Sequence, residues 1–174
     1  IRLDHRSSDE LKELLGKFCQ HEMIQTSDGH TWHFEDEAQR DYANGIWMEE
    51  YCYLQLAQHK EKLQDYRMSL EVKRFGSKFN KNEIDGAFLF NNSPYFIECK
   101  TLRFSESKGA SILYKSDSLK EELGGLRAKS IILSYRPLKA AHKERAEALG
   151  IEVFDASRLK LFKNYLEQLH CTLS

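Results

Sequence analysis

The sequence predicts an α/β fold in which a mixed central β-sheet of about five strands is flanked by helices. The first observation is the order of the apolar patterns: three strand-like segments come first, and helices and strands then alternate. Consecutive strands favour antiparallel pairs and helix–strand alternation favours parallel pairs, so we expect a mixed sheet. The second observation is composition, because 174 residues with 41% hydrophobic and 30% charged residues are typical of one soluble globular domain.

Residues 1–44 are predicted to form an extension of helices and a β-hairpin ahead of the sheet. A capping-box pattern at Ser7 opens the first helix, and apolar residues follow at helical spacing. The hairpin is expected across the Asp28-Gly29 turn, with strands on either side of it. A short helix over residues 35–43 then ends at Asn44-Gly45, two residues that interrupt helices.

The sheet and its helices are predicted over residues 45–174. The strands share apolar runs bounded by turn residues, and they are expected over residues 67–75, 84–90, 95–100, 130–135 and 151–154. The helices share apolar residues three or four apart, and they are expected over residues 46–64, around 119–123, over 139–149 and over 157–169. A four-residue turn, Asn91-Asn92-Ser93-Pro94, is expected to join the second and third strands.

Charge and composition exclude several classes of protein. No apolar run approaches the roughly 18 residues of a membrane span, so we expect no membrane partner. The net charge is −1, from 26 basic and 27 acidic residues, so any contact with nucleic acid requires a local patch. Four widely spaced cysteines favour reduced thiols and a cytoplasmic protein. The chain opens at Ile1 rather than Met, which favours a piece of a longer protein.

Three ionisable residues, Asp85, Glu98 and Lys100, interrupt strands that are otherwise apolar. If Phe90 pairs with Tyr95 across the turn, alternation places all three side chains on one face of the sheet. Asp85 then lies opposite Lys100 and diagonal to Glu98, at a backbone separation of roughly 7–8 Å. Two carboxylates at this separation can converge on one cation.

Burying two carboxylates on a sheet face is costly unless a cation compensates their charge. Hard oxygen ligands suit Mg²⁺ or Mn²⁺. The Lys100 ammonium is then placed to orient a water or to stabilise charge on a phosphate. This chemistry is metal-assisted hydrolysis of a phosphodiester. The alternative is that the acids lie at strand ends in water, with Lys100 as a simple ion-pair partner.

A further carboxylate comes from Gly45-Ile46-Trp47-Met48-Glu49-Glu50-Tyr51, at the start of the long helix. This helix must cross the sheet to bury its aromatic residues, so Glu49 or Glu50 is placed to complete a metal shell. The spacing of four residues from Gly45 favours Glu49. The alternative is that both are ordinary glutamates, favoured by the dipole at a helix N-terminus.

The pattern of Gly45 and Glu49, then Asp85, then Glu98-x-Lys100 resembles the PD-(D/E)XK nuclease superfamily. The segments "NGIWMEEYCYLQL", "NEIDGAFLFNNSPYFIECKT", "ILYKSDSLKEELGG" and "IILSYRPL" resemble, more closely, the nuclease domain of CRISPR-associated effectors that also carry a CARF sensor domain. In that family cyclic oligoadenylate binds the sensor of a homodimer and switches on metal-dependent cleavage of nucleic acid.

The resemblance implies a restriction-endonuclease-like fold over residues 45–174 and a set of site residues. Glu49, Asp85 and Glu98, with the carbonyl of Cys99, match the ligands of Mg²⁺ or Mn²⁺, and Lys100 matches the catalytic lysine. It also implies a DNA or RNA substrate and a homodimer. Residues 1–44 are too short for a CARF domain, so the sensor and its cyclic oligoadenylate are expected outside this chain.

Other interpretations stay open. The same fold serves as a non-catalytic nucleic-acid-binding or dimerisation module, or as a resolvase or restriction-type enzyme. Lys115 and the run Ser116-Asp117-Ser118 are expected to precede a helix whose N-terminus accepts a phosphate or is simply capped. A surface that grips a nucleic-acid strand is expected where basic and aromatic residues cluster, at Lys73, Arg74, Phe75, Lys78, Phe79, Lys81, Arg103 and Phe104.

Overall fold

A computed structural model describes residues 9–73, 81–102 and 106–169. The chain divides into two compact units, Ile1–Trp47 and Met48–Ser174. The predicted boundary of the nuclease domain, between residues 44 and 45, stays a prediction. No helix among the described residues has the length and apolar character needed to cross a bilayer.

The first unit contains the predicted helix and hairpin. Its elements are α1 (Asp9–Gln20), β1 (Ile24–Thr26), β2 (Trp32–Phe34), α2 (Glu37–Asp41) and the π-helix η1 (Tyr42–Ile46). Strands β1 and β2 pair antiparallel, and Oδ1 of Asp28 accepts hydrogen bonds from the N–H groups of His30 and Thr31 in the turn between them. Asn44-Gly45 lies inside η1, so the predicted interruption at these two residues is wrong.

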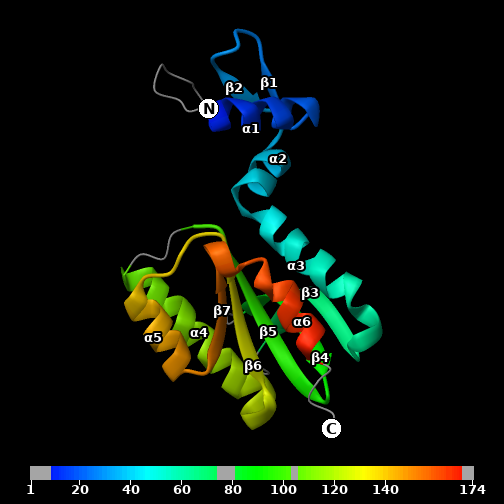
Figure 1. Cartoon of the computed structure of the whole chain (residues 1–174), viewed down its shortest axis with the longest axis vertical. Helices are drawn as coiled ribbons and strands as arrows, with labels where there is room; N and C mark the ends of the chain where they lie inside the picture. Colours follow the sequence, from blue (N-terminus) through cyan, green and yellow to red (C-terminus); the bar gives the residue numbers. More distant parts are fainter. Residues whose placement is uncertain (1–8, 74–80, 103–105, 170–174) are drawn as a thin grey trace. The chain divides into compact units, whose positions relative to one another are not determined.

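The second unit is built on a five-stranded mixed sheet (Figure 1), which confirms the predicted fold class. The strands are β3 (Asp65–Lys73), β4 (Lys81–Phe90), β5 (Ser93–Lys100), β6 (Lys129–Ser134) and β7 (Ile151–Asp155). They lie side by side in chain order. The pairs β3–β4 and β4–β5 are antiparallel, whereas β5–β6 and β6–β7 are parallel.

Helices cover both faces of this sheet. They are α3 (Trp47–Gln58), α4 (Glu106–Gly124), α5 (Ala140–Ala148) and α6 (Leu161–Gln168), with short 3₁₀ turns η2 (Lys60–Lys62), η3 (Gly125–Arg127) and η4 (Ala156–Arg158). On one face α4 and α5 enclose an apolar cluster that includes Leu113, Ile132 and Val153. On the other face, the ring of Phe154 packs against Phe162 of α6, because alternate residues of β7 face opposite ways. The sheet is therefore the middle of three layers (Figure 1).

The turn between β4 and β5 is tighter than predicted. Phe90 pairs with Ser93, which leaves a two-residue turn. Asn91 and Asn92 have φ angles of 49° and 54°, as a type I′ hairpin turn requires. Phe88, rather than Phe90, is therefore opposite Tyr95, and their rings stack with centroids 4.4 Å apart. The predicted register was wrong by two residues, and an even shift preserves the parity of the paired residues.

Two further expectations about this unit are wrong. Strand alternation from Phe88 predicts Ile84 on the face of Phe88 and Tyr95, but Ile84 packs with Ala87 and with Leu119 of α4. The last pair of the β4–β5 ladder is Gly86 with Ile97, so Ile84 pairs with Leu70 of β3 but lies beyond the ladder with β5. Helix α4 begins at Glu106, so Lys115 and its neighbours lie inside a helix rather than ahead of its N-terminus.

Candidate active site

Three ionisable side chains converge at the carboxyl end of β5. Lys100 ends this strand, and its Nζ is 2.7 Å from Oε1 of Glu98. The same Nζ is 3.7 Å from Oδ2 of Asp85 on the neighbouring strand β4. The last pair of the β4–β5 ladder is Gly86 with Ile97, and Asp85 and Glu98 are the next residues beyond that pair. The predicted convergence of these three side chains is observed.

Asp85 is held by the backbone of the strand opposite. The N–H of Cys99 donates a hydrogen bond to Oδ2 of Asp85 over 2.7 Å, and only 14% of the Asp85 side chain is exposed. Burial raises the pKa of Asp85, and the negative charge of Glu98 raises it further; Lys100 opposes both, and the net pKa is above the ordinary value. The positive charge near the Asp85 carboxylate is therefore too small to offset its burial and the charge of Glu98.

Lys100 is the nearest compensating charge. Burial alone would lower its pKa, but the carboxylates of Glu98 and Asp85 raise it, and the net shift is upward. Lys100 is therefore an ammonium at neutral pH. An ammonium donates hydrogen bonds and accepts none, so this group serves as an electrostatic and hydrogen-bonding partner rather than as a base.

Glu49 and Glu50 both lie in the first turn of α3, and the structure distinguishes them. Burial raises the pKa of Glu49, and the charges of Asp85 and Glu83 raise it further, so Glu49 lies within electrostatic range of the acidic cluster. Glu50 is exposed to solvent. Met48 and Cys52, on either side of Glu49 in the chain, are fully buried and fix the face that α3 turns to the sheet. Glu49 is therefore the acid that α3 directs toward the cluster.

Two charged residues near this cluster were not among the predicted site residues. Glu83 lies two positions before Asp85 on β4, and its charge raises the pKa of Glu49. Lys115 extends from α4, and its Nζ is 3.9 Å from Oε2 of Glu98 and 3.4 Å from the carbonyl oxygen of Glu83. Strand alternation from Asp85 was the available signal for Glu83. The position of Lys115 beside Glu98 could be predicted only from the full extent of α4, Glu106–Gly124.

Comparison with known proteins identifies the family of the chain. Residues 36–172 match the family described as Card1-like, endonuclease domain. The chain belongs to this family. The match confirms the resemblance of the four sequence segments to the nuclease domain of CRISPR-associated effectors, and it makes this chain an endonuclease domain.

Two solved structures are similar over 97% of this chain. Protein VC1899 from Vibrio cholerae has 27% sequence identity and a TM-score of 0.81. Can2 from Sulfobacillus thermosulfidooxidans, solved in complex with cyclic tetra-adenylate, has 26% identity and a TM-score of 0.79. This chain spans 46% of the length of each, so it corresponds to about half of either protein. No curated protein matches the chain.

The chemistry of this endonuclease domain fits a divalent cation. Four carboxylates, those of Glu49, Glu83, Asp85 and Glu98, face two ammonium groups, and the raised pKa values of Glu49 and Asp85 reflect this negative excess. Carboxylate oxygens are the ligands that Mg²⁺ and Mn²⁺ prefer. Within the described ranges no three acidic, thiol or imidazole side chains already surround one point. Lys100 and Lys115 contact Glu98 instead.

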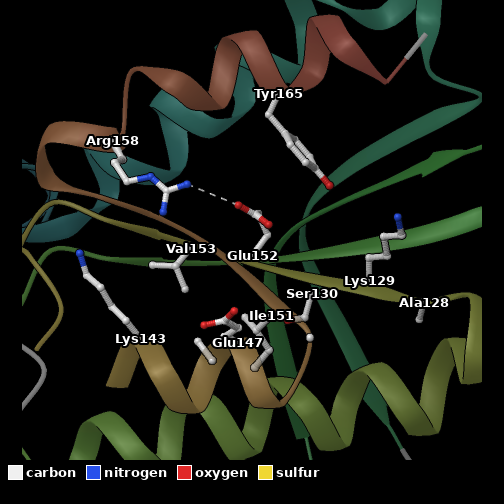
Figure 2. Close-up of a pocket in the computed structure, with 12 residues that line it drawn as sticks. Ala128, Lys129, Ser130, Lys143, Glu147, Ile151, Glu152, Val153, Arg158 and Tyr165 are labelled. Atoms are coloured by element: carbon white, nitrogen blue, oxygen red, sulfur yellow. Dashed lines mark ion pairs between the residues drawn. The ribbon is translucent and has the colours of Figure 1, made fainter. Parts of the chain in front are cut away.

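A separate cavity of about 790 Å³ lies beside the edge strand β7, between α5 and α6. Figure 2 shows that charged side chains of both signs line it, and that Arg158 points toward Glu152, 3.7 Å away. None of Glu49, Asp85, Glu98 and Lys100 lines this cavity. The acidic cluster, and not the cavity, therefore carries the candidate chemistry.

The predicted strand-gripping surface falls largely outside the described residues. Arg74, Phe75, Lys78 and Phe79 lie within 74–80, and Arg103 and Phe104 lie within 103–105. Lys73 ends β3 and Lys81 begins β4, where they pair with one another. The expectation of a basic surface beside the site stays a prediction.

Proposed function

We propose that this chain is a metal-dependent endonuclease that hydrolyses phosphodiester bonds of DNA or RNA. The observation that carries the proposal is the contact of Lys100 Nζ with Glu98 Oε1 at 2.7 Å and with Asp85 Oδ2 at 3.7 Å. Two carboxylates and an ammonium on adjacent strands form a charged group that no fold needs for stability, because apolar residues in these positions would be cheaper to bury. Membership of an endonuclease family supports the assignment.

Each residue has a role in the proposed reaction. Glu49, Asp85 and Glu98, with the carbonyl oxygen of Cys99, would hold Mg²⁺ or Mn²⁺. Such an ion, when bound, polarises a phosphoryl oxygen and lowers the pKa of a coordinated water. The Cys99 N–H fixes the Asp85 carboxylate by donating to Oδ2. Lys100 donates hydrogen bonds to the attacking water or to the phosphate and so stabilises the negative charge that develops there.

The biological setting follows from the family. We propose that the chain is the effector domain of an ancillary antiviral nuclease of type III CRISPR systems and that it acts in the cytoplasm as a homodimer. The free thiols of Cys19, Cys52 and Cys99 are typical of a reducing compartment. Can2 was solved with cyclic tetra-adenylate, which supports control of the complete protein by a cyclic oligoadenylate bound to a sensor domain. Cyclic tetra-adenylate added to these 174 residues alone is then expected to leave cleavage unchanged.

The decisive experiment is cleavage of single- and double-stranded DNA and RNA with Mg²⁺ or Mn²⁺, with and without EDTA. We expect EDTA to stop cleavage, and Glu98→Gln and Lys100→Gln to lower the rate at least about 100-fold. Glu152→Gln and Lys129→Gln are matched controls, because both residues are exposed and distant from the carboxyl end of β5. Cleavage that survives in EDTA would remove the metal mechanism. A wild-type protein that binds nucleic acid without cutting any substrate would favour the non-catalytic binding module.

A further inference from the structure

We propose that Lys115 is a second phosphate-binding residue of the active site, on the side of Glu98 away from Lys100; this inference rests on the proposed nuclease function. The two lysines come from different layers, Lys100 from β5 and Lys115 from α4. Lys100 contacts Oε1 of Glu98, and Lys115 lies 3.9 Å from Oε2. The same carboxylate thus has an ammonium at each of its oxygens.

The contacts of Lys115 differ from those of a lysine that stabilises the fold. Its Nζ is 3.4 Å from the Glu83 carbonyl oxygen and 3.9 Å from Glu98, and 42% of its side chain is exposed. Lys120, five residues later on α4, donates to the Leu149 carbonyl at 2.8 Å and contacts Asp117 at 2.7 Å. Only 16% of Lys120 is exposed. Lys120 is bound firmly, whereas Lys115 makes long contacts that a stronger acceptor can replace.

The charge of the site requires such a residue. A phosphodiester is an anion, and it must approach a cluster in which Glu49, Glu83, Asp85 and Glu98 exceed the neighbouring ammonium groups. An exposed lysine is a compact positive charge with three donors, which suits the oxygens of one phosphate. Lys115 can exchange its distant carboxylate contact for a phosphate oxygen while its backbone stays within α4. The geometry therefore makes Lys115 a substrate-binding group.

The test is the salt dependence of nucleic-acid binding. A fluorescein-labelled single-stranded DNA oligonucleotide is titrated with wild-type protein, Lys115→Gln, Lys115→Arg and Lys129→Gln, in EDTA and over a range of NaCl concentrations. Loss of one phosphate contact is expected to weaken binding of all sequences equally and to reduce the slope of log K against log[salt] by about 0.7, the value for one contact with a single strand. Lys129→Gln removes one positive charge at the opposite end of the sheet, so its slope should match wild type. Lys115→Arg should keep the slope.

The outcomes separate this inference from the proposed function. A slope for Lys115→Gln equal to that of wild type, or an equal loss in Lys129→Gln, would overturn the role of Lys115. With Mg²⁺ and a cleavable substrate, Lys115→Gln should raise KM more than it lowers kcat, because the residue binds the phosphate before the reaction. Equal unfolding temperatures exclude a folding defect. A wild-type protein that shows the Lys115 dependence in binding but never cleaves would retain this inference and refute the nuclease mechanism.

Discussion

The backbone N–H of Cys99 donates a hydrogen bond to Oδ2 of Asp85 over 2.7 Å. This contact lies just beyond Gly86–Ile97, the last pair of the β4–β5 ladder. The side chain of Asp85 thus provides the acceptor where regular backbone pairing between the two strands ends. The carboxylate is fixed beside the residues before and after Cys99, which are Glu98 and Lys100. This hydrogen bond therefore holds the Asp85 carboxylate of β4 next to Glu98 and Lys100 of β5.

Asp85→Asn is expected to stabilise the protein at pH 7. The pKa of Asp85 is raised, first by burial and then by the charge of Glu98, so the fold favours the neutral carboxyl. The cost of ionisation is absent below the pKa of the unfolded chain, about 3.9, and grows as pH rises through the folded pKa. Asparagine is neutral and keeps an acceptor for the Cys99 N–H.

The measurement is the unfolding temperature of both proteins between pH 4 and pH 8. Each kcal/mol of added stability corresponds to a rise of about 2–4 °C for a chain of this size. The difference should be largest at pH 7 and should fade toward pH 4. An unfolding temperature for Asp85→Asn below that of wild type at pH 7 would contradict the assignment of a destabilising charge.

Asp155→Ala is expected to destabilise the protein at pH 7, in contrast to Asp85→Asn. Asp155 is buried, and its Oδ2 accepts from the Leu138 N–H at 2.7 Å and contacts Lys143 Nζ at 2.9 Å. Burial alone would raise the pKa of Asp155, but these two partners lower it below the ordinary value. Its stabilising contribution is present above the unfolded pKa and is lost as pH falls through the folded pKa. Urea unfolding at pH 7 should show a loss of about 1–3 kcal/mol, and the loss should shrink at pH 3. A loss equal at both pH values would exclude an ionic contribution.

Glu49→Gln and Glu50→Gln form a matched pair. Both residues lie in the first turn of α3, which continues directly from η1, so both substitutions remove one negative charge from adjacent positions of one helix. Only Glu49 lies within range of Asp85. Glu49→Gln is expected to lower metal-dependent cleavage at least about ten-fold, as loss of a metal-site group does. Glu50→Gln should retain wild-type cleavage. Equal effects in a cleavage assay with varied Mg²⁺ would show that neither acid is a ligand.

The turn at Asn91 and Asn92 is expected to control activity through register. Deletion of Asn92 shortens a two-residue turn and shifts the pairing of β4 and β5 by one position, which sends Asp85 to the opposite face from Glu98. Cleavage should be lost. Asn91→Gly keeps the turn length and tolerates the positive φ of 49°, so it should cleave like wild type. Wild-type cleavage by the deletion variant would show that the strands absorb the change as a bulge.

Strand patterns in the sequence were sufficient for the sheet. Alternation and apolar runs located all five strands to within a few residues, because a strand buried on a sheet face must alternate its side chains regardless of its neighbours. The helix α4 was predicted too short. Its first turns contain Gly109, a weak helix former, and a Cβ there would lie 2.6 Å from Nε2 of His142 on α5. Close packing of α4 on α5, which no local pattern reveals, therefore requires a glycine inside α4.

The sequence by itself determined the mixed sheet and the identity of Asp85, Glu98 and Lys100 as a charged group on one face. That result depends only on the parity of the pairing, which the two-residue turn at Asn91-Asn92 and the predicted longer turn share. The tertiary structure alone decided the choice of Glu49 over Glu50 and the approach of Lys115 from α4. Each of these depends on how a helix or a turn is placed against the sheet. Such placement follows from packing between residues that are distant in the chain, so local periodicity does not predict it.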